Sequence, residues 1–390
     1  MNKITVIGGG AAGLMAAIAA AKNGAQVSLI EPNERLGKKI NITGKGRCNV
    51  TNDTDLEGLM AHIPRNGRFL YSALSHFTSR DTMAFFEGCG VPLKVERGDR
   101  VFPVSDSAFD ITDALKRQVK TLGVRWLHDR AASVETADGR VTAVTGEKGT
   151  YPADAVIAAA LGHTIVEPRG SLVPLVSNDD CCRHMQGLSL KNVELTVYNG
   201  KNKPVFREFG EMLFTHFGVS GPLVLSASAH LRDWGKEQYR LSIDLKPALD
   251  QQKLEARILR DISESPNRDV EKLLCGLVPH SMAPVMTRRL GLPPTLKANS
   301  LTKEQRRGLI ELLKHFAISV TGVRPVAEAI VTAGGVKVSE VKPNTMESKL
   351  VEGLYFAGEI LDVDAYTGGF NLQIAWATGH LAGVSAAERE

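Results

Sequence analysis

The sequence lacks several features that mark whole classes of protein. Its five cysteines include the adjacent pair Cys181 and Cys182, but no CxxC pair and no disulfide-framework spacing. We therefore expect reduced thiols in a cytoplasmic protein, and no metal site. Apolar runs are too short to span a bilayer, so no membrane partner is expected. A core strand predicted from residue 3 leaves no room for a signal peptide.

The sequence also lacks a large excess of either positive or negative charge. The net charge is +4 from 47 basic and 43 acidic residues, and no long basic block occurs. We expect no nucleic-acid partner on this ground, and prefer a small-molecule substrate. At 390 residues and 43% hydrophobic content, the chain can bury a large core divided among two or three domains. The oligomeric state is left open.

The clearest pattern that is present is a βαβ unit at the start of the chain. An apolar run over 3–7 precedes the glycine-rich turn GGGAAG, an Ala-rich helix that ends near Asn23, and a second apolar run over 26–30. Dinucleotide-binding units have this order of elements.

Four residues of this unit are expected to bind the dinucleotide. Gly8 permits the tight turn, Gly10 lets the backbone approach a pyrophosphate, and Gly13 lets the helix lie close to the strand. The helix N-terminus then faces the phosphates. Glu31 follows the second strand and can accept hydrogen bonds from the ribose hydroxyls, which argues against a ribose 2′-phosphate.

The loop over 35–52 combines glycines with basic, hydroxyl and amide side chains. It leaves the carboxyl end of the second strand, where ligands of open α/β sheets bind, so we expect it to wrap an anionic or hydrogen-bonding ligand. Cys48 could be a reactive thiol beside Lys45 and Arg47. A small side chain packed under the loop is the favoured interpretation.

Periodicity predicts the remaining elements of the first third. They are two short helices over 69–90, a hairpin over 90–103, a helix over 111–122, a strand over 124–127, an antiparallel meander around 137–149, and a buried parallel strand over 155–159.

The middle third changes character and predicts an inserted domain. Alternation predicts strands over 192–198, 206–209 and 240–245, and helical spacing predicts helices over 254–262, 268–277, 281–290 and 302–316. We expect residues 1–190 and 320–390 to form a discontinuous nucleotide-binding domain, interrupted by an antiparallel β domain over 191–248 and a helical subdomain over 249–319. His216 and Ser220 lie between its strands and could face a substrate, although a structural histidine is favoured.

The last seventy residues are expected to rejoin the first sheet. A strand over 329–336 and a buried strand ending near Gly358 precede a helix over 372–387. This order places a second carboxylate, Asp362 or Asp364, and a second helix N-terminus beside the first motif. One dinucleotide that touches both ends of the chain must be long, so FAD fits better than NAD.

Long motifs carry a family resemblance over nearly the whole chain. GGGAAGLMAA, GKKINITGKGRCNVTN, LFTHFGVSGP and the stretch from TAGGVKVSEV to QIAWATGHLAG resemble the bacterial FAD-dependent oxidoreductases that include aminoacetone oxidases and 3-dehydro-bile-acid reductases. The resemblance implies an α/β fold, with a Rossmann-like FAD-binding domain of the glutathione-reductase type interrupted by an inserted β-barrel-like and helical domain.

The resemblance also implies the cofactor site. The FAD-binding residues would be Gly8, Gly10, Ala11, Ala12, Gly13, Glu31, Lys39, Thr43, Gly44, Arg47, Cys48, Gly358, Glu359, Asp362, Gly369, Phe370, Asn371 and Leu372. Ala365 replaces the glycine more usual in that motif. A helix that starts at Gly369 would point its positive end at flavin N1 and O2, which stabilises the anionic reduced ring by about 1 kcal/mol.

The leading functional hypothesis is hydride transfer through flavin N5 between NAD(P)H and a small or steroid-like enone or carbonyl compound. No second GxGxxG occurs in the middle third, so NAD(P)H would dock transiently. The catalytic residue is unknown, with Tyr366 and His216 as candidates. We expect the inserted domain to cover the flavin, with Phe214, His216 and Tyr366 near the open face of the flavin ring.

Two alternatives stay open. One is an amine or aminoketone oxidase that uses dioxygen. The other is a flavin-holding binding protein or RNA-modification partner, which a long basic face on the inserted domain would favour; Arg288, Arg289 and the basic residues over 303–307 are suggestive, but a solvated helix face is preferred.

The chain departs from the family after the buried strand over 155–159. Relatives continue with a glycine-rich turn and a loop of about twenty residues, whereas here Ala160 follows directly, with no turn-forming residue from Ala158 to Leu161. Either the loop is deleted, or a mobile lid loop is missing from the sequence as read, which we favour. Consecutive Cα atoms about 3.8 Å apart would indicate a true deletion.

Overall fold

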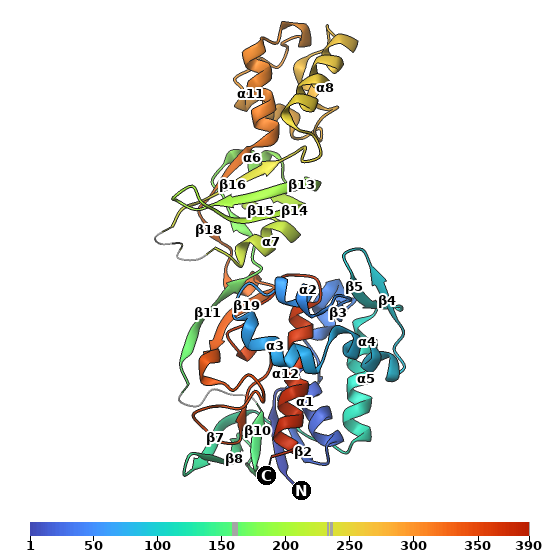
Figure 1. The fold of residues 1–390 in the computed structure, drawn as a ribbon, viewed down its shortest axis with the longest axis vertical. Coiled ribbons are helices and arrows are strands. Elements are labelled where there is room, and N and C mark those ends of the chain that lie inside the picture. Colours follow the sequence, from blue (N-terminus) through green and yellow to red (C-terminus); the bar gives the residue numbers. More distant parts are fainter. Residues whose placement is uncertain (158–162, 232–233, 235–236, 390) are drawn as a thin grey trace. The chain divides into compact units, whose positions relative to one another are not determined.

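The computed structural model describes residues 1–157, 163–231, 234 and 237–389, and these form two compact units (Figure 1). The first unit comprises 1–169 and 332–390, and the second comprises 170–331. The expected boundaries, at 190 and 320, fall inside the second unit. The reason is that two short strands beyond those boundaries, β12 (Leu175–Val176) and β18 (Gly322–Val323), pair with each other at the edge of the second unit's sheet.

A five-stranded parallel sheet forms the centre of the first unit. Its strand order is β20-β10-β1-β2-β6, with β1 at Lys3–Ile7, β2 at Gln26–Ile30, β6 at Arg125–Leu127, β10 at Ala155–Ile157 and β20 at Leu354–Tyr355. From β1 the chain adds β2 and β6 on one side of the sheet, and it later adds β10 and β20 on the other side. The order therefore reverses beside β1, where open α/β sheets bind ligands.

Helices α1 (Ala11–Lys22) and α12 (Phe370–Ala387) pack closely together (Figure 1). A Cβ atom added to Gly379 would lie 2.4 Å from the Ala12 carbonyl oxygen, and one added to Gly383 would lie 2.3 Å from that of Ala16. Both contacts advance by four residues on each helix, so the two helices run in the same direction. Their N-termini therefore point the same way, and α12, which starts at Phe370, extends about 12 Å beyond the start of α1.

Smaller elements surround this core. The helices are α2 (Leu56–Ala61), α3 (Gly67–His76), α4 (Ser79–Gly88) and α5 (Ala108–Thr121). The strands are β3 (Thr51–Asn52), β4 (Leu93–Glu96) and β5 (Arg100–Pro103) in one sheet, β7 (Ala131–Ala137), β8 (Arg140–Gly146) and β9 (Thr150–Pro152) in another, and the pair β11 (Ile165–Ser171) and β19 (Val331–Val336).

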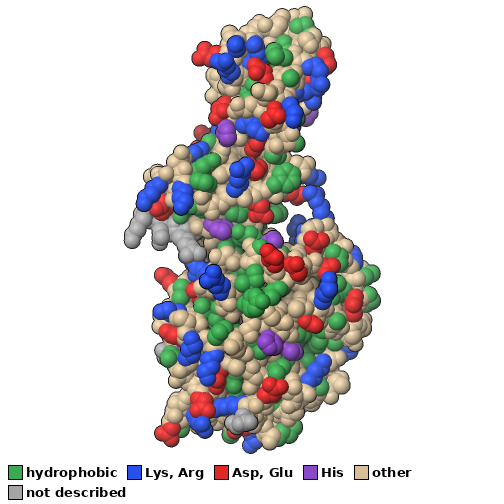
Figure 2. Space-filling model, in the orientation of Figure 1, with side chains coloured by type: hydrophobic (Ala, Val, Ile, Leu, Met, Phe, Trp, Pro, Cys, Tyr) green, Lys and Arg blue, Asp and Glu red, His purple; other side chains and the backbone are tan. Residues whose placement is uncertain are grey.

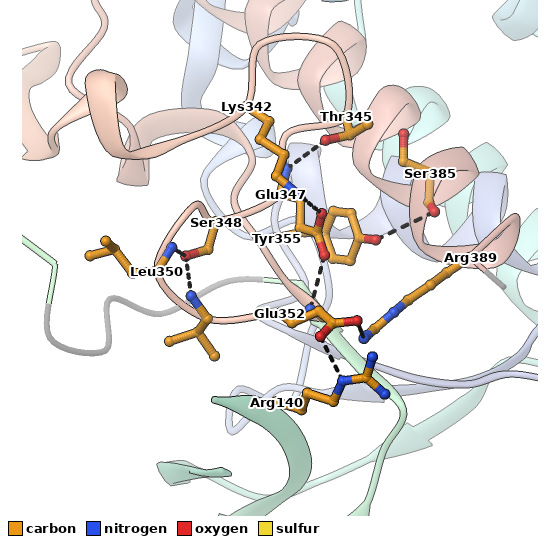
Figure 3. A network of polar contacts seen from close by, with 12 residues as sticks. Arg140, Lys342, Thr345, Glu347, Ser348, Leu350, Glu352, Tyr355, Ser385 and Arg389 are labelled. Carbon is orange, nitrogen blue, oxygen red and sulfur yellow. Dashed lines mark hydrogen bonds and ion pairs between the residues drawn. The ribbon is translucent and has the colours of Figure 1, made fainter. Parts of the chain in front are cut away.

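A polar network holds the returning strand β20 and the C-terminus in place (Figure 3). Glu352 accepts hydrogen bonds from Arg140 of β8 at 2.6 Å and from Arg389 at 2.7 Å. Glu347, which is 9% exposed, accepts a bond from the Gly353 N–H at 3.0 Å. These bonds fix the strand that leads to the C-terminal part of the site.

The second unit contains an antiparallel sheet of order β17-β16-β13-β14-β15-β12-β18. Its other strands are β13 (Ser189–Tyr198), β14 (Pro204–Thr215), β15 (Gly218–Ser220), β16 (Tyr239–Asp244) and β17 (Phe316–Val320). Its helices are α6 (Asp180–His184), α7 (Pro222–Ser228), α8 (Gln251–Glu264), α9 (Val270–Leu274), α10 (Ala283–Arg289) and α11 (Lys303–Lys314).

The fold class is confirmed, and two local predictions are wrong. The strand predicted over 206–209 does not end there, because β14 continues to Thr215 and pairs with β15. The helix expected to reach Phe316 ends at Lys314, because Phe316 begins β17 and is fully buried there. Pairing and burial override the local pattern in both places.

Two further points concern the limits of the chain. Within the described part of the protein, no helix is both long and apolar enough to cross a membrane. The junction between Ala159 and Ala160 lies outside the described residues, so the loop deletion stays a prediction.

Candidate functional site

The glycine-rich turn between β1 and α1 has the geometry that a bound pyrophosphate requires. Gly8 has φ of +101°, which disfavours other residues. A Cβ atom on Gly13 would lie 1.9 Å from the Gly8 carbonyl oxygen, so helix and strand touch there. Gly10, the N-cap of α1, has no heavy atom within 4 Å of an added Cβ. The backbone at Gly10 is therefore open to a ligand, directly before Ala11 and Ala12.

Glu31 lies beside this turn as a buried carboxylate, 8% exposed. One oxygen accepts the Gly9 N–H at 2.7 Å, and the other accepts the backbone N–H of Asn33 at 2.9 Å and its amide at 2.6 Å. A cavity of about 380 Å³ opens here, lined by Gly9, Gly10, Glu31, Asn33, Arg35, Lys38, Lys39 and Ile42. Its three basic side chains suit an anionic ligand.

The N-terminus of α12 is the second helix N-terminus of the candidate site. Its N-cap, Gly369, has φ of +99°, and a Cβ atom there would lie 2.4 Å from the Thr51 backbone, so only glycine fits. Phe370, Asn371 and Leu372 form the first turn. The free N–H groups of this turn point in the same direction as those of α1.

Residues from both ends of the chain meet between the two helices. A Cβ atom added to Gly358, which has φ of +74°, would lie 2.7 Å from the Ala12 Cβ. The Lys39 ammonium pairs with the Glu359 carboxylate at 2.5 Å. The structure therefore brings together four of the predicted site residues that are far apart in sequence.

Asp362 is held by residues that the sequence analysis did not single out. Arg65 donates to its carboxylate at 2.7 Å, and the side chains of this pair are 12% and 10% exposed. The Asn66 amide donates to the Asp362 backbone oxygen at 2.6 Å. Asn371 bonds the Ala365 backbone through both amide atoms, at 3.0 and 2.7 Å, so its side chain shapes this loop.

His62 is a second residue that the sequence analysis missed. Its ring stacks on Phe370 with centroids 4.3 Å apart, and its centroid lies 5.8 Å from that of Tyr366, edge to face. Its Nδ1 atom lies 2.7 Å from the Gly58 carbonyl oxygen, so Nδ1 carries the proton in the neutral ring. The only sequence signal was its place shortly before α3.

The loop over 35–52 supplies mainly backbone and support. The Thr43 hydroxyl bonds the Ile40 carbonyl at 2.7 Å, and Gly44 has φ of +56°. Arg47 pairs with Glu96 and with Asp106, and it stacks on Phe102 at 4.2 Å. Its side chain therefore secures the loop to the β4–β5 hairpin.

Cys48 is fully buried, and burial raises the pKa of its thiol to about 12. The thiol is therefore neutral at physiological pH and suits packing better than nucleophilic chemistry. Next to it, Asn49 Oδ1 is buried and has no hydrogen-bond partner among the described residues.

The two candidates from the inserted domain have different surroundings. His216 belongs to the second unit, is exposed, and packs edge to face against Phe217. Phe214 is fully buried within that unit. The expectation that it lies near the open face of the flavin stays a prediction.

The residues of the first unit fit FAD. The open backbone at Gly10, the buried carboxylate of Glu31 and two parallel helix N-termini match a long dinucleotide with a pyrophosphate at one end of the site and a flavin at the other. Bound FAD supplies hydride transfer at N5, and the protein supplies binding, orientation and exclusion of water.

The sequence matches one family model, described as the HI0933-like protein Rossmann domain, over residues 2–385. The chain belongs to this family. It is an FAD-dependent oxidoreductase, as the resemblance implied.

Among the relatives of this chain, a 3-dehydro-bile acid Δ(4,6)-reductase of Clostridium scindens is 32% identical over 416 aligned positions, covering 100% of both chains. A ribosomal RNA dihydrouridine synthase of Escherichia coli is 31% identical, covering 96% of this chain and 95% of that one. Among solved structures, the 3-ketosteroid Δ1-dehydrogenase of Sterolibacterium denitrificans has a TM-score of 0.47 and 13% identity, covering 99% of this chain and 100% of that one.

Proposed function

We propose that the protein is a reductase that takes hydride from NAD(P)H onto FAD and delivers it to a carbon–carbon double bond conjugated to a carbonyl group. The two named relatives support this reaction, because a bile-acid Δ(4,6)-reductase and a dihydrouridine synthase both saturate such a bond. The substrates of these two relatives differ greatly in size, since one is a steroid and the other is an RNA. The shared chemistry is therefore a better guide than either substrate.

The observation that carries the proposal is the pair of parallel helix N-termini. The residues that we propose to hold FAD around them are those named from the resemblance, with Gly10 and Glu31 at the nucleotide end and Gly358, Asp362 and Gly369 at the flavin end. The partial positive charge of the α12 N-terminus would stabilise a reduced, anionic flavin by about 1 kcal/mol.

His62 and Tyr366 are the proposed groups for a proton that accompanies the hydride. Both rings contact or approach the first turn of α12, and the Gly58 carbonyl orients the His62 ring with Nε2 on the far side from its bonded nitrogen. NADPH or NADH would bind transiently, since only one GxGxxG motif is present in the sequence.

Anaerobic spectroscopy of the purified holoprotein tests this proposal. We expect NADH or NADPH to bleach the flavin band, and a 3-oxo-4-ene steroid or a uridine-containing RNA to restore it without dioxygen. Free FAD with the same reductants is the control. Bleaching by aminoacetone, with reoxidation by dioxygen alone, would contradict the reductase and favour the oxidase. No bleaching by any of these compounds would exclude both.

A further inference from the structure

The positive charge of the chain is concentrated in the second unit. Residues 170–331 contain 22 Lys and Arg against 17 Asp and Glu, whereas the rest of the chain contains 25 against 26. The second unit thus carries +5 and the first carries −1. Figure 2 shows Lys and Arg side chains on the visible face of the second unit.

One face of the second unit's sheet combines aromatic and basic side chains. Tyr198 on β13 pairs with Arg240 on β16, and the Arg240 guanidinium stacks over the Tyr198 ring at 4.8 Å. Arg207 and Phe209 alternate on β14 and oppose Thr196 and Glu194 of β13. Residues directly opposite in an antiparallel pair share a face, so these side chains lie on one surface.

The other face of the same sheet is apolar core. Leu195, Val197 and Leu241 alternate with the residues above and are fully buried. This alternation shows that Phe209, which is 54% exposed, is not part of that core. A large aromatic ring is thus presented to solvent between charged neighbours.

Phe209 borders a cavity of about 570 Å³ whose lining residues are Asn192, Phe209, Leu245, Lys246, Pro247, Ala248 and Leu249. Its polar groups suit a flat ring with an attached anion. Asn192 offers amide donors and an acceptor, and Lys246 offers a cation. Burial and the charge of Arg257 lower the pKa of Lys246, so an anion bound there would favour its protonated form.

Two carboxylates on this surface are paired with basic side chains. Glu194 pairs with Arg207 at 2.7 Å, and Asp244 pairs with Lys314 at 2.6 Å. Lys246 and the exposed Arg240 therefore remain as the cations that a polyanion would meet first. We call the surface formed by Asn192, Tyr198, Phe209, Arg240 and Lys246 the β-face.

We infer that the β-face binds single-stranded RNA, with a base stacked on Phe209 and backbone phosphates on Arg240 and Lys246. An exposed sheet face that combines aromatic rings with Arg and Lys is how many modules hold single-stranded RNA, because bases stack on the rings while cations track the phosphates. The charge of the unit complements a polyanion.

This inference rests on the proposed function, since uracil is a ring with a carbonyl-conjugated double bond and RNA is thus one substrate of that reaction. RNA binding is measured without turnover, however. The inference on RNA binding and the proposed reductase function can therefore fail separately.

Fluorescence anisotropy of a 5′-labelled 16-nucleotide oligouridylate with the full-length holoprotein tests the inference. We expect saturable binding that weakens as salt rises. Phe209→Ala should weaken binding about tenfold, which corresponds to about 1.4 kcal/mol of lost stacking. Phe109→Ala, which removes a ring with 51% exposure from the first unit, is the matched control and should change nothing.

Arg240→Ala should weaken binding and lower the slope of log Kd against log salt by about 0.7, the value for one phosphate contact on a single strand. Arg130→Ala is the control from the first unit, since Arg130 is also an exposed arginine, 67% exposed in its side chain. No binding, or binding unchanged by both Phe209→Ala and Arg240→Ala, would overturn the inference. Preference for an acidic peptide over the RNA would overturn it too. Flavin bleaching by NAD(P)H, measured on the same variants, reports on the proposed function alone.

Discussion

Two glycines only three positions apart should respond to alanine in opposite ways. Gly13→Ala places a methyl group 1.9 Å from the Gly8 carbonyl oxygen, a backbone atom that cannot turn away. Gly10→Ala places its methyl group where no heavy atom lies within 4 Å, at a φ of −83° that alanine adopts freely. The first change should disturb the fold, and the second should disturb only a ligand that approaches the backbone.

The expected magnitudes follow from these distances. Relief of the Gly13→Ala overlap requires α1 to move away from β1 by about 1 Å, which should cost about 3 kcal/mol, the upper range for overpacking. For a unit of this size that lowers the Tm by roughly 6–12 °C. Gly10→Ala should leave the Tm of the FAD-free protein within about 3 °C, because alanine is a poorer N-cap but loses less entropy on folding.

FAD titration of the apoprotein separates the two effects. If a pyrophosphate lies against Gly10, Gly10→Ala should raise the Kd for FAD by about 10- to 100-fold, or about 1.4–2.8 kcal/mol. Gly149→Ala, at another glycine with open space and ordinary φ, is the control and should change neither quantity. An unchanged FAD affinity for Gly10→Ala would refute the assignment of the site. An unchanged Tm for Gly13→Ala would refute the helix–strand contact.

Two further predictions concern the loop that follows Glu31. The hydrogen bond to Arg47 is the main cause that lowers the pKa of Glu96, and hydrogen bonds to Lys94 and Arg47 lower that of Asp106. These pairs therefore stabilise the fold at pH values above the ordinary carboxylate pKa of about 4. The stabilisation is lost as the pH falls and the carboxylates are protonated. Arg47→Met should therefore be less stable than the wild type at pH 7 in urea unfolding, and the difference should vanish toward pH 3; a constant difference would be inconsistent with this reasoning. Because burial raises the pKa of Cys48 to about 12, iodoacetamide at pH 8 should label it only after unfolding, and native-state labelling seen by peptide mass spectrometry would show that the loop opens.

The sequence was sufficient to predict the first βαβ unit and the parallel sheet, because local signals agree with tertiary packing there. Strands β1 and β2 have the predicted bounds, and Gly8 and Gly13 have the conformation and the contact expected of them. These features depend on residues within thirty-one positions of one another. Short-range glycine and periodicity rules apply to such segments.

The partners of Asp362 were not predictable in this way. Arg65 and Asn66 reach it across nearly three hundred residues, and no local pattern marks an arginine before a helix as the partner of a distant carboxylate. The partners of Arg47 were not predictable either. Its expected contact with the cofactor stays a prediction, but in the folded chain its side chain pairs with Glu96 and Asp106, which no local pattern marks as its partners.

The first turn of α12 contains a fully buried amide, Gln373. Its oxygen accepts hydrogen bonds from the hydroxyls of Thr51 at 2.7 Å and Thr82 at 2.8 Å, and its nitrogen donates to the Phe77 carbonyl at 2.8 Å. The amide thus joins the first turn of α12 to β3 and α4.

Gln373→Met keeps the length of the side chain but leaves two buried hydroxyls and one carbonyl without their partner. At about 1–3 kcal/mol for each such group, partly relieved by relaxation, we expect a loss of about 3 kcal/mol in unfolding free energy. If this amide also sets where α12 begins, the variant should bind FAD more weakly. Its flavin should also be harder to reduce, because the partial positive charge of the helix N-terminus would no longer be held against the reduced ring. Gln238→Met, an exposed glutamine of the second unit, is the matched control. A destabilised Gln373→Met protein with the flavin potential of the wild type would show that the network holds the core together without positioning the cofactor.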